Sequence, residues 1–298
     1  MKYAINTLLN MENNKDFAVF ILTHGRPNNV KTFSTLKKSG YTGKVYFIVD
    51  NEDKCINEYI KNFGVENVRI FDKKAMADKV DMGNNFDGIK TILHARNASF
   101  DIAKDLGITY FMQLDDDYIS FEYRYKSKNG KKLLVHKIDN FDTVVELYLS
   151  FYKKTNFKSI AFAQGGDFIG GVNNINAQKW PLSRKCMNSF ICSTDREFQF
   201  VGAMNDDVNT YVTLGSKGLL FGTVPMISVV QTATQSNKNG LTDMYKKFGT
   251  YCKSFTTVMM HPSGVKVSMM NTNNVRLHHS IKWINTVPMI LNEKHKKY

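Results

Sequence analysis

The sequence predicts an α/β fold of the doubly wound type, with a mostly parallel central sheet and helices on both of its faces. Two observations predict this fold. In the first half of the chain, short apolar runs of strand length alternate with segments that repeat apolar residues at helical spacing. Hydrophobic residues make up 43% of the 298 residues, which is enough to bury a large core. Because no internal repeat or linker is visible, we expect residues 1–298 to form a single domain.

The first strand is the clearest element of this pattern. Residues 17–22 (FAVFIL) form a continuous apolar run that stops at the Gly/Pro loop 23–27, as expected of a buried strand. The alternation continues to a fourth strand that ends directly in three acids. The pattern predicts strands at 17–22, 45–49, 68–71 and 110–114, and helices over 30–37, 56–63 and 89–106.

The second half of the chain mixes hairpin and helix signals. Residues 121–135 are typical of a hairpin whose tip is the lysine-rich segment 126–132. Segment 165–171 holds four glycines, which permit a ligand to approach the backbone closely. We further expect helices over 142–155 and 208–214, strands at 160–163, 219–230 and 265–270, and a helical C-terminal tail.

Charge and cysteine content narrow the function classes. The chain has 40 Lys+Arg against 27 Asp+Glu, a formal charge of +13, which favours a polyanionic partner such as nucleic acid over an ordinary basic protein. Its four cysteines form no CxxC pair, so neither a disulfide framework nor a zinc site is indicated. No apolar stretch reaches the roughly 18–20 residues of a membrane helix, and the N-terminal segment lacks the core of a signal peptide. We therefore expect a soluble, cytoplasmic protein without a membrane partner, and the oligomeric state stays open.

The strongest chemical signal is the acidic triplet Asp115, Asp116 and Asp117 at the end of the fourth strand. Open α/β sheets bind ligands at the carboxyl ends of their strands. The alternate acids Asp115 and Asp117 can share a divalent ion through carboxylate oxygens. A solvated acidic turn is the alternative. Because three adjacent carboxylates repel one another without a cation, we favour metal binding.

The segments around this triplet resemble a known family. HARNA at 94–98, followed by a helix and by LDDD at 114–117, resembles the ARN…LDDD pattern of inverting GT-A glycosyltransferases. The loop THGRP at 23–27 looks like their nucleotide-binding loop, and GAMNDDVN at 202–209 is similar to the acidic motif that carries their catalytic base. The segments follow the family's order along the chain. This resemblance implies a metal-dependent enzyme that moves a sugar from a UDP-sugar to a hydroxyl acceptor.

The resemblance also implies roles for single residues. The metal would be Mn²⁺ or Mg²⁺, and its expected ligands are Asp115, Asp117 and a distal histidine, for which His278 is preferred over the adjacent His279. The expected catalytic base is Asp207 or Asp206, because Asp206 stands where the family usually has Glu. The residues expected to bind the nucleotide sugar are Thr23, His24, Arg26, Asp50, Arg96, Asp115, Asp116, Gly166 and Asp167. The alternatives are exposed positions for the first loop, a helix-surface ion pair for Arg96 and a tight loop for 165–171.

A second resemblance concerns the acceptor. The compact, basic chain with its THGRP loop resembles the glycosyltransferases associated with thymine and methylcytosine dioxygenases, which occur in phages and kinetoplastids. It implies a hydroxymethylated pyrimidine in DNA as acceptor, a nucleotide-sugar half at about 17–120 and an acceptor half at about 121–298. The expected nucleic-acid contacts are Arg124, Lys126, Lys128, Lys131 and Lys132, with a solvated hairpin tip as the alternative.

Two other functions stay open. The same enzyme could use a saccharide, lipid or protein acceptor, or the chain could be a nucleic-acid-binding module that keeps the fold without catalysis. The costly acidic triplet argues against the second. A nucleotidyltransferase is rejected, because loop 23–27 lacks the Gly-rich, Lys-containing sequence of that class. Segment 206–207 favours inversion at the sugar, although retaining relatives also have a distal metal-binding histidine.

Overall fold

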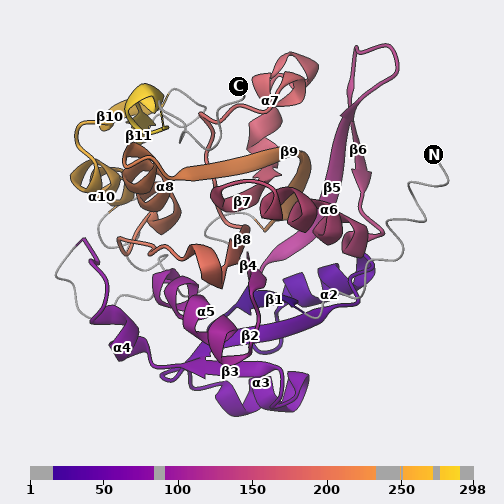
Figure 1. Cartoon of the computed structure of the whole chain (residues 1–298), viewed down its shortest axis with the longest axis vertical. Coiled ribbons are helices and arrows are strands. Elements are labelled where there is room, and N and C mark those ends of the chain that lie inside the picture. Colours follow the sequence, from indigo (N-terminus) through magenta and orange to yellow (C-terminus); the bar gives the residue numbers. More distant parts are fainter. Residues whose placement is uncertain (1–15, 84–90, 233–248, 250, 271–275, 289–298) are drawn as a thin grey trace.

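The computed structural model describes residues 16–83, 91–232, 249, 251–270 and 276–288. Its strands are β1 (Phe17–Leu22), β2 (Lys44–Asp50), β3 (Val68–Phe71), β4 (Tyr110–Asp115), β5 (Tyr118–Lys126), β6 (Leu133–Lys137), β7 (Phe157–Gln164), β8 (Phe190–Ser193), β9 (Leu220–Gln231), β10 (Val265–Met270) and β11 (Arg276–Ile281). The first nine form one sheet in the order β3-β2-β1-β4-β8-β7-β9-β5-β6, and β10 pairs separately with β11. Figure 1 shows this arrangement.

Most strands of the large sheet run in one direction. β1 is parallel to β2 and β4, β2 is parallel to β3, and β7 is parallel to β9. β8 is antiparallel to both of its neighbours, β4 and β7, and β5 is antiparallel to both β9 and β6. Within the described sheet only β5 and β8 are therefore reversed. The predicted α/β class with a mostly parallel sheet is confirmed.

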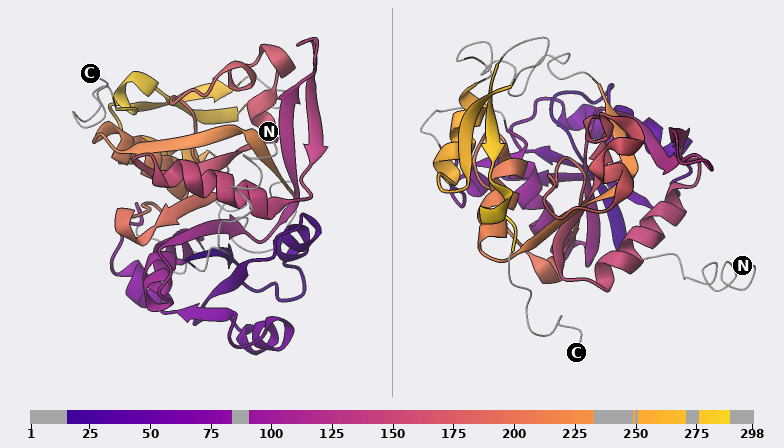
Figure 2. Two further views of the ribbon diagram at one scale, coloured as in Figure 1. Left: turned by 45° about the vertical axis from the view of Figure 1, so that its right-hand side comes forward. Right: turned by 90° about the horizontal axis from the view of Figure 1, so that it is seen from above.

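Helices cover both faces of this sheet. They are α2 (Lys31–Lys38), α3 (Ile56–Phe63), α4 (Lys73–Ala77), α5 (Leu93–Asp105), α6 (Phe141–Lys153), α7 (Ile175–Gln178), α8 (Asp206–Ser216) and α10 (Cys252–Met260). One hydrophobic cluster includes residues of α2, α3 and α6, and a second includes residues of α4, α5 and α8. Figure 2 shows α10, β10 and β11 on the opposite side of the molecule from the β5–β6 hairpin.

β1 explains why the sequence gives a sheet covered on both faces. All six of its residues are buried. Because side chains alternate along a strand, Val19 and Ile21 join the first cluster, while Phe20 and Leu22 join the second. A strand that packs on both faces must be apolar throughout, as FAVFIL is.

Two predictions about the elements need correction. The expected helical tail is wrong over 276–281, which forms β11 and pairs with β10 in register. The helix predicted over 89–106 begins later than expected, at Leu93, and ends at Asp105; the described residues 91 and 92 are not helical, and 89–90 lie outside the described residues. The sequence patterns also missed the short strand β8 and helix α10. No helix in the described part of the chain has the length and apolar character needed to cross a membrane.

Candidate active site

The candidate site lies where the carboxyl ends of parallel strands meet. β1 leads into the loop that contains Thr23, His24 and Arg26; β2 ends at Asp50 and β4 at Asp115. Since these three strands are neighbours and run in the same direction, their ends share one edge of the sheet. Segments that are far apart in the sequence therefore meet at this edge.

Asp116 forms hydrogen bonds that link the loop after β1 to the end of β4. Its carboxylate accepts hydrogen bonds from the Thr23 hydroxyl at 2.8 Å and from Arg26 Nη1 at 3.0 Å. The Tyr59 hydroxyl on α3 completes the link, because it lies 2.9 Å from Thr23 Oγ1 and accepts the Arg26 N–H at 2.8 Å. Burial raises the pKa of Asp116, and Arg26 and Thr23 oppose this rise. Asp116 is thus engaged inside the protein and positions the loop.

His24 forms a second link, to the end of β2. Its Nδ1 lies 2.6 Å from Asp50 Oδ2 and 3.6 Å from Asp53 Oδ2. Asp53 also accepts the backbone N–H groups of Gly25 at 2.6 Å and Cys55 at 2.8 Å. The hydrogen bond to Asp50 raises the pKa of His24. Burial alone would raise the pKa of Asp50, but the hydrogen bond and charge of His24 outweigh it, so that this pKa is lowered.

Arg96 joins the two acidic motifs from a buried position on α5. Its Nε lies 2.9 Å from Asp206 Oδ2, and its Nη2 lies 3.4 Å from Asp115 Oδ1. The guanidinium also contacts the ring faces of Phe190 and Phe200, at 4.8 and 5.5 Å from the ring centroids. With a side chain only 3% exposed, Arg96 is not the helix-surface ion pair considered above. It connects the end of β4 to the start of α8.

The acids around Arg96 are held close together against their mutual repulsion. Burial raises the pKa of Asp115 to about 7; Arg96 opposes the rise, and the neighbouring carboxylates add to it. Burial also raises the pKa of Asp206, again opposed by Arg96 and reinforced by Asp207. Burial alone would lower the pKa of Arg96, but Asp206 and Asp115 raise it. The positive charge of the buried Arg96 therefore offsets the negative charges of several carboxylates.

The two candidate bases have different surroundings. Asp206 is buried and paired with Arg96, whereas Asp207 is only half-buried in the first turn of α8. The Asp207 carboxylate accepts the N–H of Val208 at 2.8 Å. Asp207 is therefore the more accessible of the two carboxylates.

Lys185 lies beside Asp207 and was missed from the sequence. Burial and the adjacent Arg184 lower the pKa of Lys185, while the negative charge of Asp207 opposes this. Nothing in the local sequence marks Lys185, because a half-buried lysine in a loop has no periodicity or motif. Its ammonium adds a positive charge next to the candidate base.

The expected three-residue metal site is not formed. Among the described residues, no three His, Cys, Asp or Glu side chains are grouped so as to hold a metal ion, so His278 does not complete a site with Asp115 and Asp117. The neighbouring His279 is the buried histidine of β11, and its Nδ1 lies 3.4 Å from Asn205 Nδ2. The histidine pair thus packs beside the start of α8.

A two-carboxylate site still fits the residues present. Asp115 is the acid whose pKa is raised by Asp117, Asp116 and Asp206, so a cation there would relieve repulsion that Arg96 offsets only in part. Asp117 stays half-exposed, with one oxygen accepting the Thr232 hydroxyl at 2.8 Å. Mg²⁺-type sites commonly use one or two carboxylates and take their other ligands from substrate phosphates and water.

The glycine-rich segment holds one expected ligand residue in contacts within the protein. The Asp167 carboxylate is buried, accepts the Gln164 N–H at 2.8 Å and forms an ion pair with Arg184. Both oxygens of Asp167 therefore stabilise the loop, and a bond from Asp167 to sugar hydroxyls stays a prediction. Gly166 is exposed, and no described atom lies within 4 Å of the position of a Cβ there. Space for a ligand beside this backbone remains.

The hairpin residues also divide into two groups. Lys126, Lys128, Lys131 and Lys132 are exposed at the tip, as expected. Arg124 is different: it donates to Ser228 Oγ at 2.7 Å and to Glu122 Oε2 at 2.9 Å, and its guanidinium contacts the face of Phe168. Arg124 is thus held by contacts within the protein, and its expected contact with nucleic acid stays a prediction.

Comparison with known proteins gives one family match. A family model described as TET-Associated Glycosyltransferase matches residues 17–240. No curated protein matches the sequence.

The chain is also similar to several solved structures. One is the mannosyltransferase PcManGT from Pyrobaculum calidifontis in complex with GDP-Man and Mn²⁺, with TM-score 0.43, 8% identity and coverage of 87% of this chain and 79% of that chain. Another is glucosyl-3-phosphoglycerate synthase from Mycobacterium tuberculosis in complex with Mn²⁺, UDP and phosphoglyceric acid, with TM-score 0.44, 11% identity and coverage of 96% and 92%. A third is S. aureus TarS 1–349 in complex with UDP-GlcNAc, with TM-score 0.41, 10% identity and coverage of 82% and 66%.

The His24–Asp50 pair predicts a pH dependence of stability. The folded-state pKa of His24 lies above 6.5, so the pair stabilises the fold below that pH and the stabilisation is lost as the pH rises through the raised pKa. The pKa of Asp50 lies below 3.8, so its contribution persists down to acid pH. We expect NMR titration to give His24 a pKa above 6.5 in the wild type and a lower one in Asp50→Asn. The exposed change Asp101→Asn is the control, and an unchanged His24 pKa in Asp50→Asn would contradict the pairing.

Arg96 gives a second prediction. Arg96→Met leaves the buried Asp206 and the partly exposed Asp115 without their cation, and should lower the free energy of unfolding by about 3–5 kcal/mol, as breaking a buried pair does. Urea denaturation measures the change. Lys79→Met is the matched control, since Lys79 pairs with Asp101 at 3.7 Å on the surface and should contribute less than about 1 kcal/mol. Equal effects of the two substitutions would mean that Arg96 does not hold the site together.

Proposed function

Because this chain belongs to the TET-associated glycosyltransferase family, we propose that it transfers a sugar from a UDP-sugar to the hydroxyl of a hydroxymethylated pyrimidine in DNA. The observation that carries the transfer chemistry is the gathering of Asp115 and Asp207 around the buried Arg96 at the carboxyl edge of the sheet. A family of this kind needs a site for a diphosphate and a base for the acceptor hydroxyl, and the acids of this edge supply both.

The first loop is proposed to receive the nucleotide. Thr23 and Arg26 are fixed by Asp116, and His24 is fixed by Asp50, through contacts within the protein itself. A loop that is already ordered loses little conformational entropy on binding, so its backbone and side chains can act as a preorganised surface. In this proposal Asp50 faces the nucleoside, and Arg26 adds positive charge near the phosphates.

A divalent ion is proposed to bind Asp115 and Asp117. Carboxylate oxygens suit Mg²⁺ and Mn²⁺, and the diphosphate and water would provide the remaining ligands. The bound ion supplies positive charge that stabilises the departing diphosphate. Lys185, whose pKa responds to the charge of Asp207, is proposed as a second cation for the same leaving group.

Asp207 is the proposed base. It would accept the proton of the acceptor hydroxyl as that oxygen attacks the anomeric carbon from the face opposite the diphosphate, which inverts the sugar. Asp206 instead holds Arg96, so it acts as a positioning residue. The greater exposure of Asp207 supports its choice over the adjacent Asp206 as the base.

DNA as acceptor rests on the family and on charge. The formal charge of +13 favours a polyanionic substrate, and four exposed lysines concentrate at the tip of the β5–β6 hairpin. Neither a saccharide nor a small hydroxyl acceptor explains such an excess of positive charge.

The proposed function is tested by sugar transfer. The protein is incubated with Mn²⁺, a panel of UDP-sugars and DNA that contains 5-hydroxymethylcytosine or 5-hydroxymethyluracil, and the digested nucleosides are analysed by mass spectrometry. We expect a hexose or pentose mass increment that EDTA abolishes. Hydrolysis of a UDP-sugar without modification of the DNA would indicate that the acceptor is a saccharide or a protein. The absence of both reactions would favour the non-catalytic module.

Asp207→Asn tests the proposed base. It should lower turnover about a hundredfold or more, as expected for loss of general base catalysis, and leave UDP binding in the presence of Mn²⁺ unchanged. Calorimetry measures the binding and the transfer assay measures the turnover. Asp195→Asn, an exposed acid away from this edge, is the control. If turnover survives in Asp207→Asn, either Asp206 is the base or the sugar is transferred with retention.

A further inference from the structure

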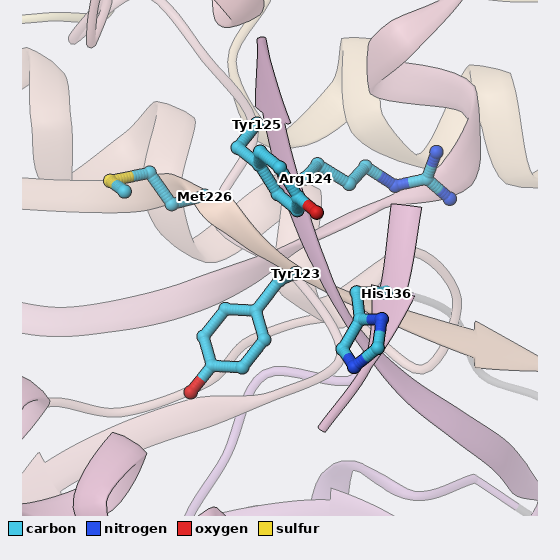
Figure 3. A pocket seen from close by; sticks show the side chains of 5 residues that line it. All are labelled: Tyr123, Arg124, Tyr125, His136 and Met226. Atoms are coloured by element: carbon cyan, nitrogen blue, oxygen red, sulfur yellow. The ribbon is translucent and has the colours of Figure 1, made fainter. Parts of the chain in front are cut away.

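The β5–β6 hairpin carries a hollow that the proposed chemistry does not use. Its volume is about 360 Å³, which lies within the roughly 300–1,000 Å³ of small-molecule sites. The lining residues are Tyr123, Arg124, Tyr125, His136 and Met226 (Figure 3). The hollow is formed by β5 and β6 together with Met226 of β9, away from the acids at the carboxyl edge.

Aromatic rings dominate this hollow. Tyr123 and His136 are direct cross-strand partners, so their side chains share one face of the hairpin, and Figure 3 shows both directed into the same space. Tyr125, two residues along β5, belongs to the same face and is 48% exposed. Met226 is 62% exposed, so its thioether is accessible beside these rings. The hollow thus offers ring faces and a polarisable thioether to a planar ligand.

Arg124 forms the rigid back of the hollow. Figure 3 shows its guanidinium pointing away from Tyr123 and His136. There it is held by Ser228, Glu122 and the ring of Phe168. Because this side chain is fixed by three partners, the strand that carries the two tyrosines is anchored to the body of the protein.

Positive charge lies next to these rings. The exposed lysines of the tip are Lys126, Lys128, Lys131 and Lys132, and no ion pair joins any of them to an acid in the described part of the chain. A strand of nucleic acid combines planar bases with one phosphate per nucleotide, and proteins bind it by pairing aromatic stacking with a basic track. A saccharide can stack on a tyrosine but brings no charge for four lysines. A second copy of the chain would bring the same lysines and be repelled.

We propose that this hollow is a nucleobase subsite, in which Tyr125 and His136 stack an unpaired base of a DNA strand whose phosphates contact the lysines of the hairpin tip. The choice of DNA rests on the function proposed above. β5 begins at Tyr118, directly after Asp117, and seven residues of strand separate Tyr118 from Tyr125, at most about 23 Å. At about 3.4 Å per nucleotide of a strand, the stacked base lies up to roughly seven nucleotides from the base that is modified.

Binding of single-stranded DNA tests the subsite. Fluorescence anisotropy with a labelled 16-nucleotide strand should show Tyr125→Ala and His136→Ala weakening binding about 5- to 150-fold, the range for loss of one stacked base. Tyr125→Phe should bind like the wild type, because it keeps the ring. Val135→Ala is the matched control: Val135 is 49% exposed but pairs with Arg124, on the other face of the hairpin.

A strand with abasic positions separates stacking from charge. Wild-type protein should bind it as weakly as Tyr125→Ala binds the normal strand, and Tyr125→Ala should lose nothing further on it. Replacing the four tip lysines with glutamine should reduce the slope of log affinity against log salt by about 3, since each phosphate contact on a single strand contributes about 0.7. Tyr125→Ala should leave that slope unchanged.

The outcomes distinguish this subsite from the proposed function. Wild-type affinity of both Tyr125→Ala and His136→Ala, alongside sugar transfer to DNA by the wild type, would overturn the subsite and keep the function. UDP-sugar hydrolysis by the wild type with no measurable DNA binding would overturn both the subsite and the DNA acceptor, and keep the transferase.

Discussion

The Arg96 guanidinium between Asp115 and Asp206 is the interaction on which the candidate site depends. Burial raises the pKa of both acids, so each favours losing its charge, and the buried cation opposes this. Asp115 ends β4 and Asp206 begins α8, and the Arg96 guanidinium and the aromatic rings around it connect these two segments. An Arg suits the position better than a Lys, because a planar guanidinium keeps its charge when buried and can contact two carboxylates and two ring faces at once.

The acids at the carboxyl edge of the sheet divide into two functional groups because their contacts within the protein differ. Asp116 and Asp206 are buried and occupied by Arg26, Thr23 and Arg96, so they hold segments together. Asp115, Asp117 and Asp207 are each partly exposed and keep oxygens that a ligand can reach. The acids that hold the scaffold thereby restrict where the accessible ones lie. This is how catalytic groups are kept in place when neighbouring charges would drive them apart.

The sequence predicts a structural feature well when the residues that determine this feature lie in one segment of the chain. Continuous apolar runs such as residues 17–22 predict buried strands, and three acids at a strand end predict the edge at which they gather, because both follow from one segment. Tyr59, Asp53 and Lys185 could not be found, since their partners come from other elements. The same reason explains contacts that the sequence did not predict. Asp167 pairs with Arg184 and Arg124 pairs with Glu122, and no local pattern indicates either ion pair. β11 alternates Leu277, His279 and Ile281 with period two, but its strand state is fixed by pairing with β10.

The distribution of charged side chains suggests the order in which the substrates of the proposed reaction bind. The edge around Asp115 and Asp207 is acidic, so it repels a polyanion, whereas the lysines at the hairpin tip attract one. In the proposed reaction, a DNA strand would bind first at the hairpin, where neither metal nor donor is needed. A cation held by Asp115 and Asp117 would reduce the negative charge that the DNA meets as its acceptor hydroxyl approaches Asp207. The cation in turn needs phosphate oxygens, because the protein offers it two carboxylates and, within its described residues, no third ligand. Binding of the donor with its metal ion should thus precede productive placement of DNA, and the distance between hairpin and acids lets the enzyme hold the polymer while the donor exchanges.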